Sequence, residues 1–146
     1  MVKLLVGIDA KMTGLWSVVY ALNLAKRMDI KIAVLLVSDT APQTLSPSPS
    51  AGEETSEKDE TAIKRRLEKL ITDGRSEGIS IDYYLAYGSY KEEIIKFIKE
   101  KGITLLVVDF PSPDRKEASE KLPELLGEIK LRTHCRIEVV HQKDVK

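Results

Sequence analysis

Two short, almost uninterrupted hydrophobic runs near the start of the chain constrain its fold most. They cover residues 3–8 and 31–37, and near-continuous hydrophobicity is typical of parallel strands that are covered on both faces. Between the two runs, apolar residues recur at the spacing of an amphipathic helix: Leu15, Val18, Val19, Leu22 and Ala25. This order predicts a right-handed unit of strand, helix and strand.

The same alternation continues to the end of the chain. Further strands are predicted at residues 79–86, 104–108 and 136–141. Further helices are predicted to start around Thr61, at Tyr90 and near Pro123, a residue that suits a first helical turn. Five strands alternating with four helices predict an α/β protein with one open parallel sheet.

Length and charge limit the functional classes. A chain of 146 residues suits a single domain, residues 1–146, which folds without metal or disulfides. Lys plus Arg and Asp plus Glu balance at 23 each, so no net positive field favours nucleic acid or an anionic membrane. The single cysteine, Cys135, is predicted to be a buried packing residue. No apolar run is long enough to span a bilayer, and we expect a cytoplasmic protein.

Residues 38–59 differ in character from the rest of the chain. Pro42, Pro47 and Pro49 are mixed there with Ser, Thr, Gly and Glu, a composition that cannot bury a core. We predict a mobile loop. A lid or a phosphorylated segment is an alternative to a plain connection.

The stretch 109–127 follows a predicted strand, at the place where open parallel sheets usually carry a ligand loop. Such loops hold phosphates with closely approaching backbone N–H groups. Here Pro111 and Pro113 lack that donor and several carboxylates repel anions. The stretch therefore argues against a phosphate site.

In order and spacing, several segments resemble the universal stress protein family. They are residues 2–9, 21–27, 32–39, 87–94 (Tyr-Gly-Ser-Tyr-Lys-Glu-Glu-Ile), 103–108 and 134–140. The resemblance implies a Rossmann-like fold of the adenine nucleotide alpha hydrolase type, with strand order 3-2-1-4-5 and helices on both faces of the sheet. It also implies a dimer through the last strand in many members, some of which bind ATP and some of which do not.

The resemblance suggests an adenosine contact at Asp9, at the end of the first strand, and a backbone contact near Val37. A carboxylate can accept hydrogen bonds from an exocyclic amine or a ribose hydroxyl. Asp9 could equally cap a turn, and both interpretations stay open.

The phosphate half departs from the family pattern of glycines. Asp109 stands in the place of the first glycine, and Pro123 and Glu124 fall where a Gly-Ser/Thr pair is expected. Because a carboxylate repels a triphosphate and proline donates no hydrogen bond, ATP binding in the family manner is not expected, and we predict no cofactor. Lys11 and Arg115 are candidate anion contacts, although two cations are common on any surface.

No catalytic or metal constellation is recognisable. The two histidines, His134 and His141, lie at or beside the last strand at an odd offset, which places them on opposite faces. No serine has suitably spaced histidine and acid partners. The chain is therefore predicted not to be an enzyme.

The last strand is a candidate dimer strand. Along it Ile137, Val139 and His141 alternate with Arg136, Glu138 and Val140. An edge strand there would offer unpaired backbone groups to a second copy across a two-fold axis. We predict a homodimer.

These observations favour a non-catalytic stress-response or regulatory module that docks on unidentified protein partners. The alternative is an adenine-nucleotide switch or weak ATPase that uses Asp9 with phosphate contacts from Lys11 or Arg115. A response-regulator receiver is a third possibility. It fits poorly, because it requires an Asp where the third strand ends, and Tyr87-Gly88 occurs there.

Overall fold

The structure is a computed structural model that describes residues 2–10, 15–38, 51–111 and 116–141. The strands are β1 (Val2–Asp9), β2 (Ile30–Ser38), β3 (Ile81–Tyr87), β4 (Leu105–Asp109) and β5 (Arg136–Val140). The helices are α1 (Trp16–Ala25), α2 (Ala51–Ser76), α3 (Tyr90–Lys101) and α4 (Lys116–Thr133).

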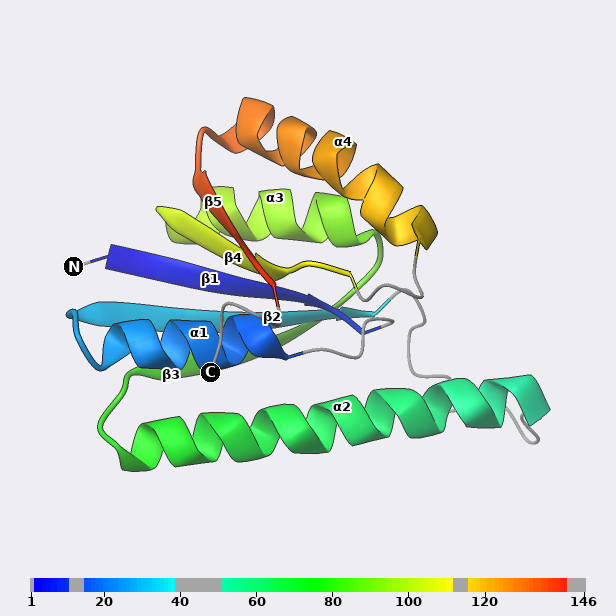
Figure 1. The fold of residues 1–146 in the computed structure, drawn as a ribbon, viewed down its shortest axis with the longest axis horizontal. Helices are drawn as coiled ribbons and strands as arrows, with labels where there is room; N and C mark the ends of the chain where they lie inside the picture. Colours follow the sequence, from blue (N-terminus) through cyan, green and yellow to red (C-terminus); the bar gives the residue numbers. More distant parts are fainter. Residues whose placement is uncertain (1, 11–14, 39–50, 112–115, 142–146) are drawn as a thin grey trace.

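The strands form one parallel sheet of order β3-β2-β1-β4-β5, which confirms the predicted fold. The central strand is β1, whose Val6 lies opposite Val34 of β2 and Val107 of β4. Helices α1 and α2 cover one face of the sheet, and α3 and α4 cover the other (Figure 1). Because all five strands are parallel, their carboxyl ends lie at the same end of the sheet. Residues that follow different strands come together there.

The core consists of two hydrophobic clusters, one on each face of the sheet. Along β1, Leu4, Val6 and Ile8 face α1 and α2, whereas Leu5 faces α3 and α4. This double burial explains why β1 is hydrophobic at almost every position. Cys135 is buried in the second cluster, as predicted, and its burial raises the pKa of the thiol.

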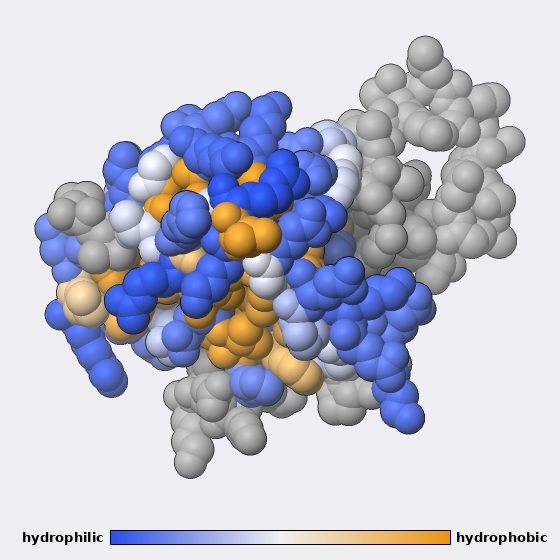
Figure 2. Space-filling view, turned by 90° about the horizontal axis from the view of Figure 1, so that it is seen from above, coloured by the Kyte–Doolittle hydropathy of each residue, from blue (hydrophilic) through white to orange (hydrophobic). Residues whose placement is uncertain are grey.

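The outer faces of the helices are mainly hydrophilic. Figure 2 shows this on the side that carries α3 and α4, where hydrophobic residues surface among charged ones. Helices α3 and α4 are thus amphipathic, and their apolar stripes lie on the sheet. Within the described ranges, no helix combines the length and apolar character needed to cross a membrane.

The predicted loop 38–59 is too long. Ser38 is still part of β2, and α2 begins at Ala51, about ten residues before the predicted start near Thr61. The last proline is Pro49, and the residues after Ala51 are rich in Glu, which favours the first turns of a helix. Residues 39–50 lie outside the described ranges.

Helix α4 also begins earlier than predicted. It starts at Lys116, so Pro123 lies inside the helix and not in its first turn. The preceding Glu117, Ala118, Glu120 and Lys121 are good helix formers. Their preference and the packing of α4 outweigh the backbone hydrogen bond that Pro123 cannot make.

Candidate functional site

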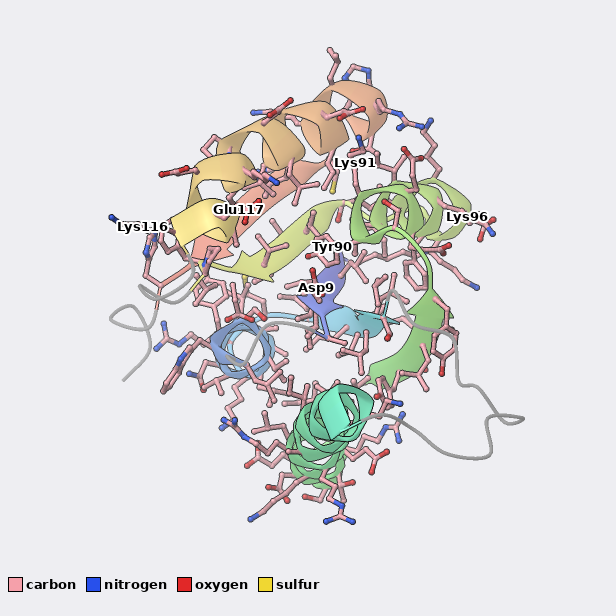
Figure 3. All side chains as sticks on the ribbon, turned by 90° about the vertical axis from the view of Figure 1, so that its right-hand side faces the viewer. Asp9, Tyr90, Lys91, Lys96, Lys116 and Glu117 are labelled. Carbon is pink, nitrogen blue, oxygen red and sulfur yellow. The ribbon has the colours of Figure 1, made fainter. Side chains whose placement is uncertain are left out.

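The carboxyl ends of β1 and β4 lie side by side and open into a cavity of about 150 Å³. Asp9 ends β1 and Asp109 ends β4, and both line this cavity. Figure 3 looks onto these strand ends and shows Asp9 and Tyr90 close together at their centre. Asp9, for which the family resemblance suggests an adenosine contact, therefore lies at a concave feature of the structure.

Most of the cavity wall is apolar. On the sheet side it is lined by Ile8, Val108 and Pro111 beside the two carboxylates. On the other side the first half of α4 contributes Ala118, Leu122, Leu125 and Leu126. These leucines face inward because they follow the helical repeat of α4.

Tyr90, the first residue of α3, forms part of the cavity wall. Its hydroxyl donates a hydrogen bond of 2.8 Å to the carbonyl oxygen of Gly7. Burial, followed by the negative charges of Asp9 and Asp109, raises the pKa of this hydroxyl well above its ordinary value. Tyr90 therefore remains protonated throughout the physiological range.

The close approach of Tyr90 depends on glycine at position 7. A Cβ there would lie 2.7 Å from Cδ1 of Ile94 and 3.0 Å from the Tyr90 hydroxyl oxygen. Both contacts are shorter than the packing of a protein interior allows. Gly7 thus makes room for α3 against β1.

Asp109 caps the N-terminus of α1. The backbone N–H and the hydroxyl of Ser17 donate to its two carboxylate oxygens, each at 2.7 Å. Leu15, the residue preceding the helix, provides no side-chain cap, so a carboxylate 92 positions away in the chain satisfies these donors. Burial nevertheless raises the pKa of Asp109, outweighing the hydrogen bonds from Ser17 and from the Trp16 backbone.

Several charged side chains of α4 are engaged in ion pairs. Lys121, at the cavity wall, pairs with Glu117 at 2.8 Å, and this hydrogen bond lowers the pKa of Glu117. Lys91 of α3 pairs with Glu128 of α4, also at 2.8 Å. The second pair joins the two helices that cover this face of the sheet.

Of the predicted site residues, Asp9 lines the cavity but the side chain of Val37 does not. Asp9 lines the cavity, and Val37 lies opposite it in the register of β1 and β2. The side chain of Val37 is buried in the core, and its carbonyl oxygen accepts a hydrogen bond of 2.9 Å from the Ala10 backbone. Lys11 and Arg115 lie outside the described residues.

The predicted dimer strand lies at an edge of the sheet, next to β4. Arg136 and Glu138 are exposed, whereas Ile137 and Val139 are partly buried and Val140 is fully buried. His141 follows β5 and stacks on Phe110, with ring centroids 4.4 Å apart. Among the described residues, no group of His, Cys, Asp and Glu side chains could hold a metal ion.

Several residues that line the cavity or contact its lining residues have no clear signal of this position in the sequence. The role of Ser17 was invisible because its partner is distant in sequence. Leu122 precedes the predicted start of the last helix near Pro123, although it lies within α4. Tyr90 had one usable signal, its position directly after the turn that follows a strand end.

The family model of the universal stress proteins matches residues 1–112. The chain belongs to the universal stress protein family. The matched part contains β1 to β4 and ends just after the strand that Asp109 closes. No curated protein sequence matches the chain significantly.

Solved universal stress proteins share the fold at low identity. UspA from Lactobacillus plantarum has a TM-score of 0.68 at 17% identity, with 95% of this chain and 97% of that chain covered. An Arabidopsis thaliana family protein with AMP bound has a TM-score of 0.59 at 15% identity, with 97% and 92% covered. A universal stress protein in complex with cAMP has a TM-score of 0.61 at 16% identity, with 96% of both chains covered.

Proposed function

We propose that this universal stress protein is a non-catalytic regulatory module of the stress response that does not bind ATP in the family manner. The observation that carries the proposal is the position of Asp109. Its carboxylate caps the N-terminus of α1, and Asp109 is one of the residues that line the cavity at the strand ends. A phosphate there would meet a negative charge in place of a bare glycine backbone.

The second half of the family phosphate motif is also altered. Pro123 and Glu124 stand where the Gly-Ser/Thr pair is expected, and both lie within α4. Inside a helix, backbone N–H groups are used by carbonyls one turn earlier, and proline has none. This segment therefore has no backbone donors to offer a triphosphate.

The second candidate function is an adenine-nucleotide switch or weak ATPase. Two observations favour it: structural neighbours carry AMP or cAMP, and Asp9 lines a cavity at the corresponding strand end. Under this alternative, Lys11 or Arg115 would supply the phosphate contacts. The alternative predicts that Asp9→Ala abolishes binding.

Calorimetric titration of the full chain with ATP and with AMP separates the two functions. We expect no saturable binding of either nucleotide. Saturable ATP binding that is lost in Asp9→Ala would replace the first function with the second. Asp109→Gly restores the first glycine of the motif, and a gain of nucleotide binding in this variant would show that Asp109 excludes phosphate.

The proposed module works in the cytoplasm as a homodimer paired through β5. The edge position of this strand, with Arg136 and Glu138 exposed, supports pairing in which opposite charges set the register. Analytical ultracentrifugation at micromolar protein is expected to show a dimer. A monomer at all accessible concentrations would exclude this assembly.

A further inference from the structure

We propose that the second half of β3, residues 83–87, binds an extended segment of a partner protein, which adds to the sheet as a sixth strand. The segment has apolar residues at alternate positions and an acidic residue at the end that lies beside Arg75. The residues described as lining the cavity include none from β3. The inference therefore does not depend on whether this chain binds a nucleotide.

The backbone of β3 points alternate N–H and C=O groups toward an open edge. β3 is an edge strand next to β2, and Figure 3 shows it at one side of the sheet between α2 and α3. The Gly88 N–H, just after β3, donates to the Ser38 carbonyl of β2, so the even-numbered residues face β2. The backbone groups of Tyr83, Leu85 and Tyr87 therefore point outward. Such a row can pair with a further strand.

The first half of this edge is protected, whereas the second half is not. The guanidinium of Arg75 donates to the Ile81 carbonyl from Nε at 3.0 Å and from Nη2 at 2.8 Å. Asp82 pairs with Lys31 at 3.7 Å. Residues 83–87 read Tyr-Tyr-Leu-Ala-Tyr, without the charges or proline that commonly protect an exposed edge. A further strand can therefore pair with this half.

Two large side chains beside the outward backbone groups are exposed. Leu85 is 48% exposed and Tyr87 is 39% exposed. Both lie on the face of the sheet that α2 covers, because Leu36, the register partner of Leu85, belongs to the core cluster on that face. An added strand would place alternate apolar side chains beside them and remove this surface from water.

Arg75 provides charge complementarity at the protected end. Two of its N–H groups are used by Ile81, and the others can donate to a carboxylate. The ion pairs between described residues do not include Arg75. An antiparallel segment, which gives the more stable pairing, would bring its C-terminal end to Arg75. An acidic residue there would accept a charge-assisted hydrogen bond.

A different protein fits this edge better than a second copy of the chain. The proposed homodimer pairs β5, the opposite edge of the sheet. If β3 also paired with itself, the dimers would join into an open-ended sheet. A strand from a different protein would end the sheet instead. This step rests on the proposed pairing through β5.

The probe is a synthetic peptide, Val-Thr-Val-Thr-Val-Thr-Glu, acetylated at its N-terminus and amidated at its C-terminus. Binding to the full chain is followed by two-dimensional ¹H–¹⁵N NMR. We expect saturable shifts in β3. Amide exchange should slow at Tyr83, Leu85 and Tyr87, which face outward, and stay unchanged at Tyr84 and Ala86, which face β2. N-methylation of the three valines should lower the affinity at least about tenfold, because it removes the donors that face β3.

Variants locate the surface. Leu85→Lys is expected to weaken peptide binding about tenfold or more. The matched control is Leu131→Lys, at an exposed leucine of α4, which should leave the affinity unchanged. Lysine in place of the peptide's glutamate should weaken binding about fivefold, and Arg75→Gln should abolish this difference. Circular dichroism establishes that each variant is folded.

The inference is overturned if the peptide does not bind, if the N-methylated peptide binds equally well, or if Leu85→Lys and Leu131→Lys have the same effect. Slower exchange at the outward amides on concentrating the protein without peptide would make a second copy the occupant, which also overturns it. Ultracentrifugation keeps this outcome separate from that of the proposed dimer. A monomer that binds the peptide as described would support the β3 surface and remove only the pairing through β5.

Discussion

The Asp109 carboxylate combines two roles at the level of a single residue, as the cap of α1 and as a wall of the cavity. Both of its oxygens accept hydrogen bonds from Ser17 in a partly buried setting. The cap stabilises the helix, but the charge is held away from water. Asparagine at this position would keep an acceptor for the backbone N–H and remove the charge.

We therefore expect Asp109→Asn to be more stable than the wild type at pH 7. Burial raises the pKa of Asp109 in the folded protein above its value in the unfolded chain. The contribution of Asp109 protonation to the free energy of unfolding is therefore fully present below the unfolded-state pKa, and it is lost as pH rises through the folded-state pKa. The advantage of the variant should thus shrink as pH falls toward about 4.5. Urea unfolding at both pH values measures it. An advantage that grows in acid would contradict the assigned cause.

Asp109→Ala is the control for the cap. It removes both the charge and the acceptor for Ser17. Loss of a helix cap typically costs about 1 kcal/mol. Equal stabilities of the alanine and asparagine variants would mean that the cap contributes little.

Gly7 is the second residue whose identity is set by packing. Gly7→Ala is expected to lower the free energy of unfolding by about 1–3 kcal/mol, because the new methyl group overlaps Ile94 and approaches the Tyr90 hydroxyl. Urea unfolding monitors the change. The control is Gly127→Ala in α4, where a Cβ meets no atom within 4 Å, and it should stabilise the protein by about 0.5–1 kcal/mol.

At the scale of elements, one residue of α4 lowers the stability of its own helix. Pro123 lies in the eighth position of the helix and is exposed. Pro123→Ala restores a backbone hydrogen bond without loss of core packing, and we expect about 1–3 kcal/mol of stabilisation in urea unfolding. The neighbouring exposed Glu124→Ala should have little effect. If Pro123→Ala lowers the free energy of unfolding, the proline is needed for the packing of α4 over the cavity.

Elements with a local signal at both ends could be predicted from the sequence. The predicted start of α3 at Tyr90 is confirmed, and Gly102 ends the helix in the left-handed conformation that glycine favours. The start of α4 was wrong because proline in a helix interior is rare, and tertiary packing overrode that rule. Of the site, the family resemblance drew attention to Asp9 at a strand end, and its role as an adenosine contact stays a prediction. The bond between Asp109 and Ser17 joins distant segments and leaves no local pattern.

At the scale of the whole molecule, the two edges of the sheet should behave differently. Amide hydrogen exchange is expected to be slowest in β1, which is paired on both sides and buried on both faces. Exchange in β5 should slow further as protein concentration rises, because the proposed dimer pairs this edge. Exchange in β3, the opposite edge, should not depend on concentration. Equal behaviour of β3 and β5 would contradict pairing through β5.

The central place of the first strand also affects synthesis on the ribosome. β1 precedes the other described strands and leaves the exit tunnel before them, yet one of its neighbours, β4, begins only at Leu105. Until that strand emerges, the apolar residues of β1 have no partner strand on one side. Folding must therefore wait until most of the chain is translated, and the growing polypeptide presents a binding site for chaperones for much of that time.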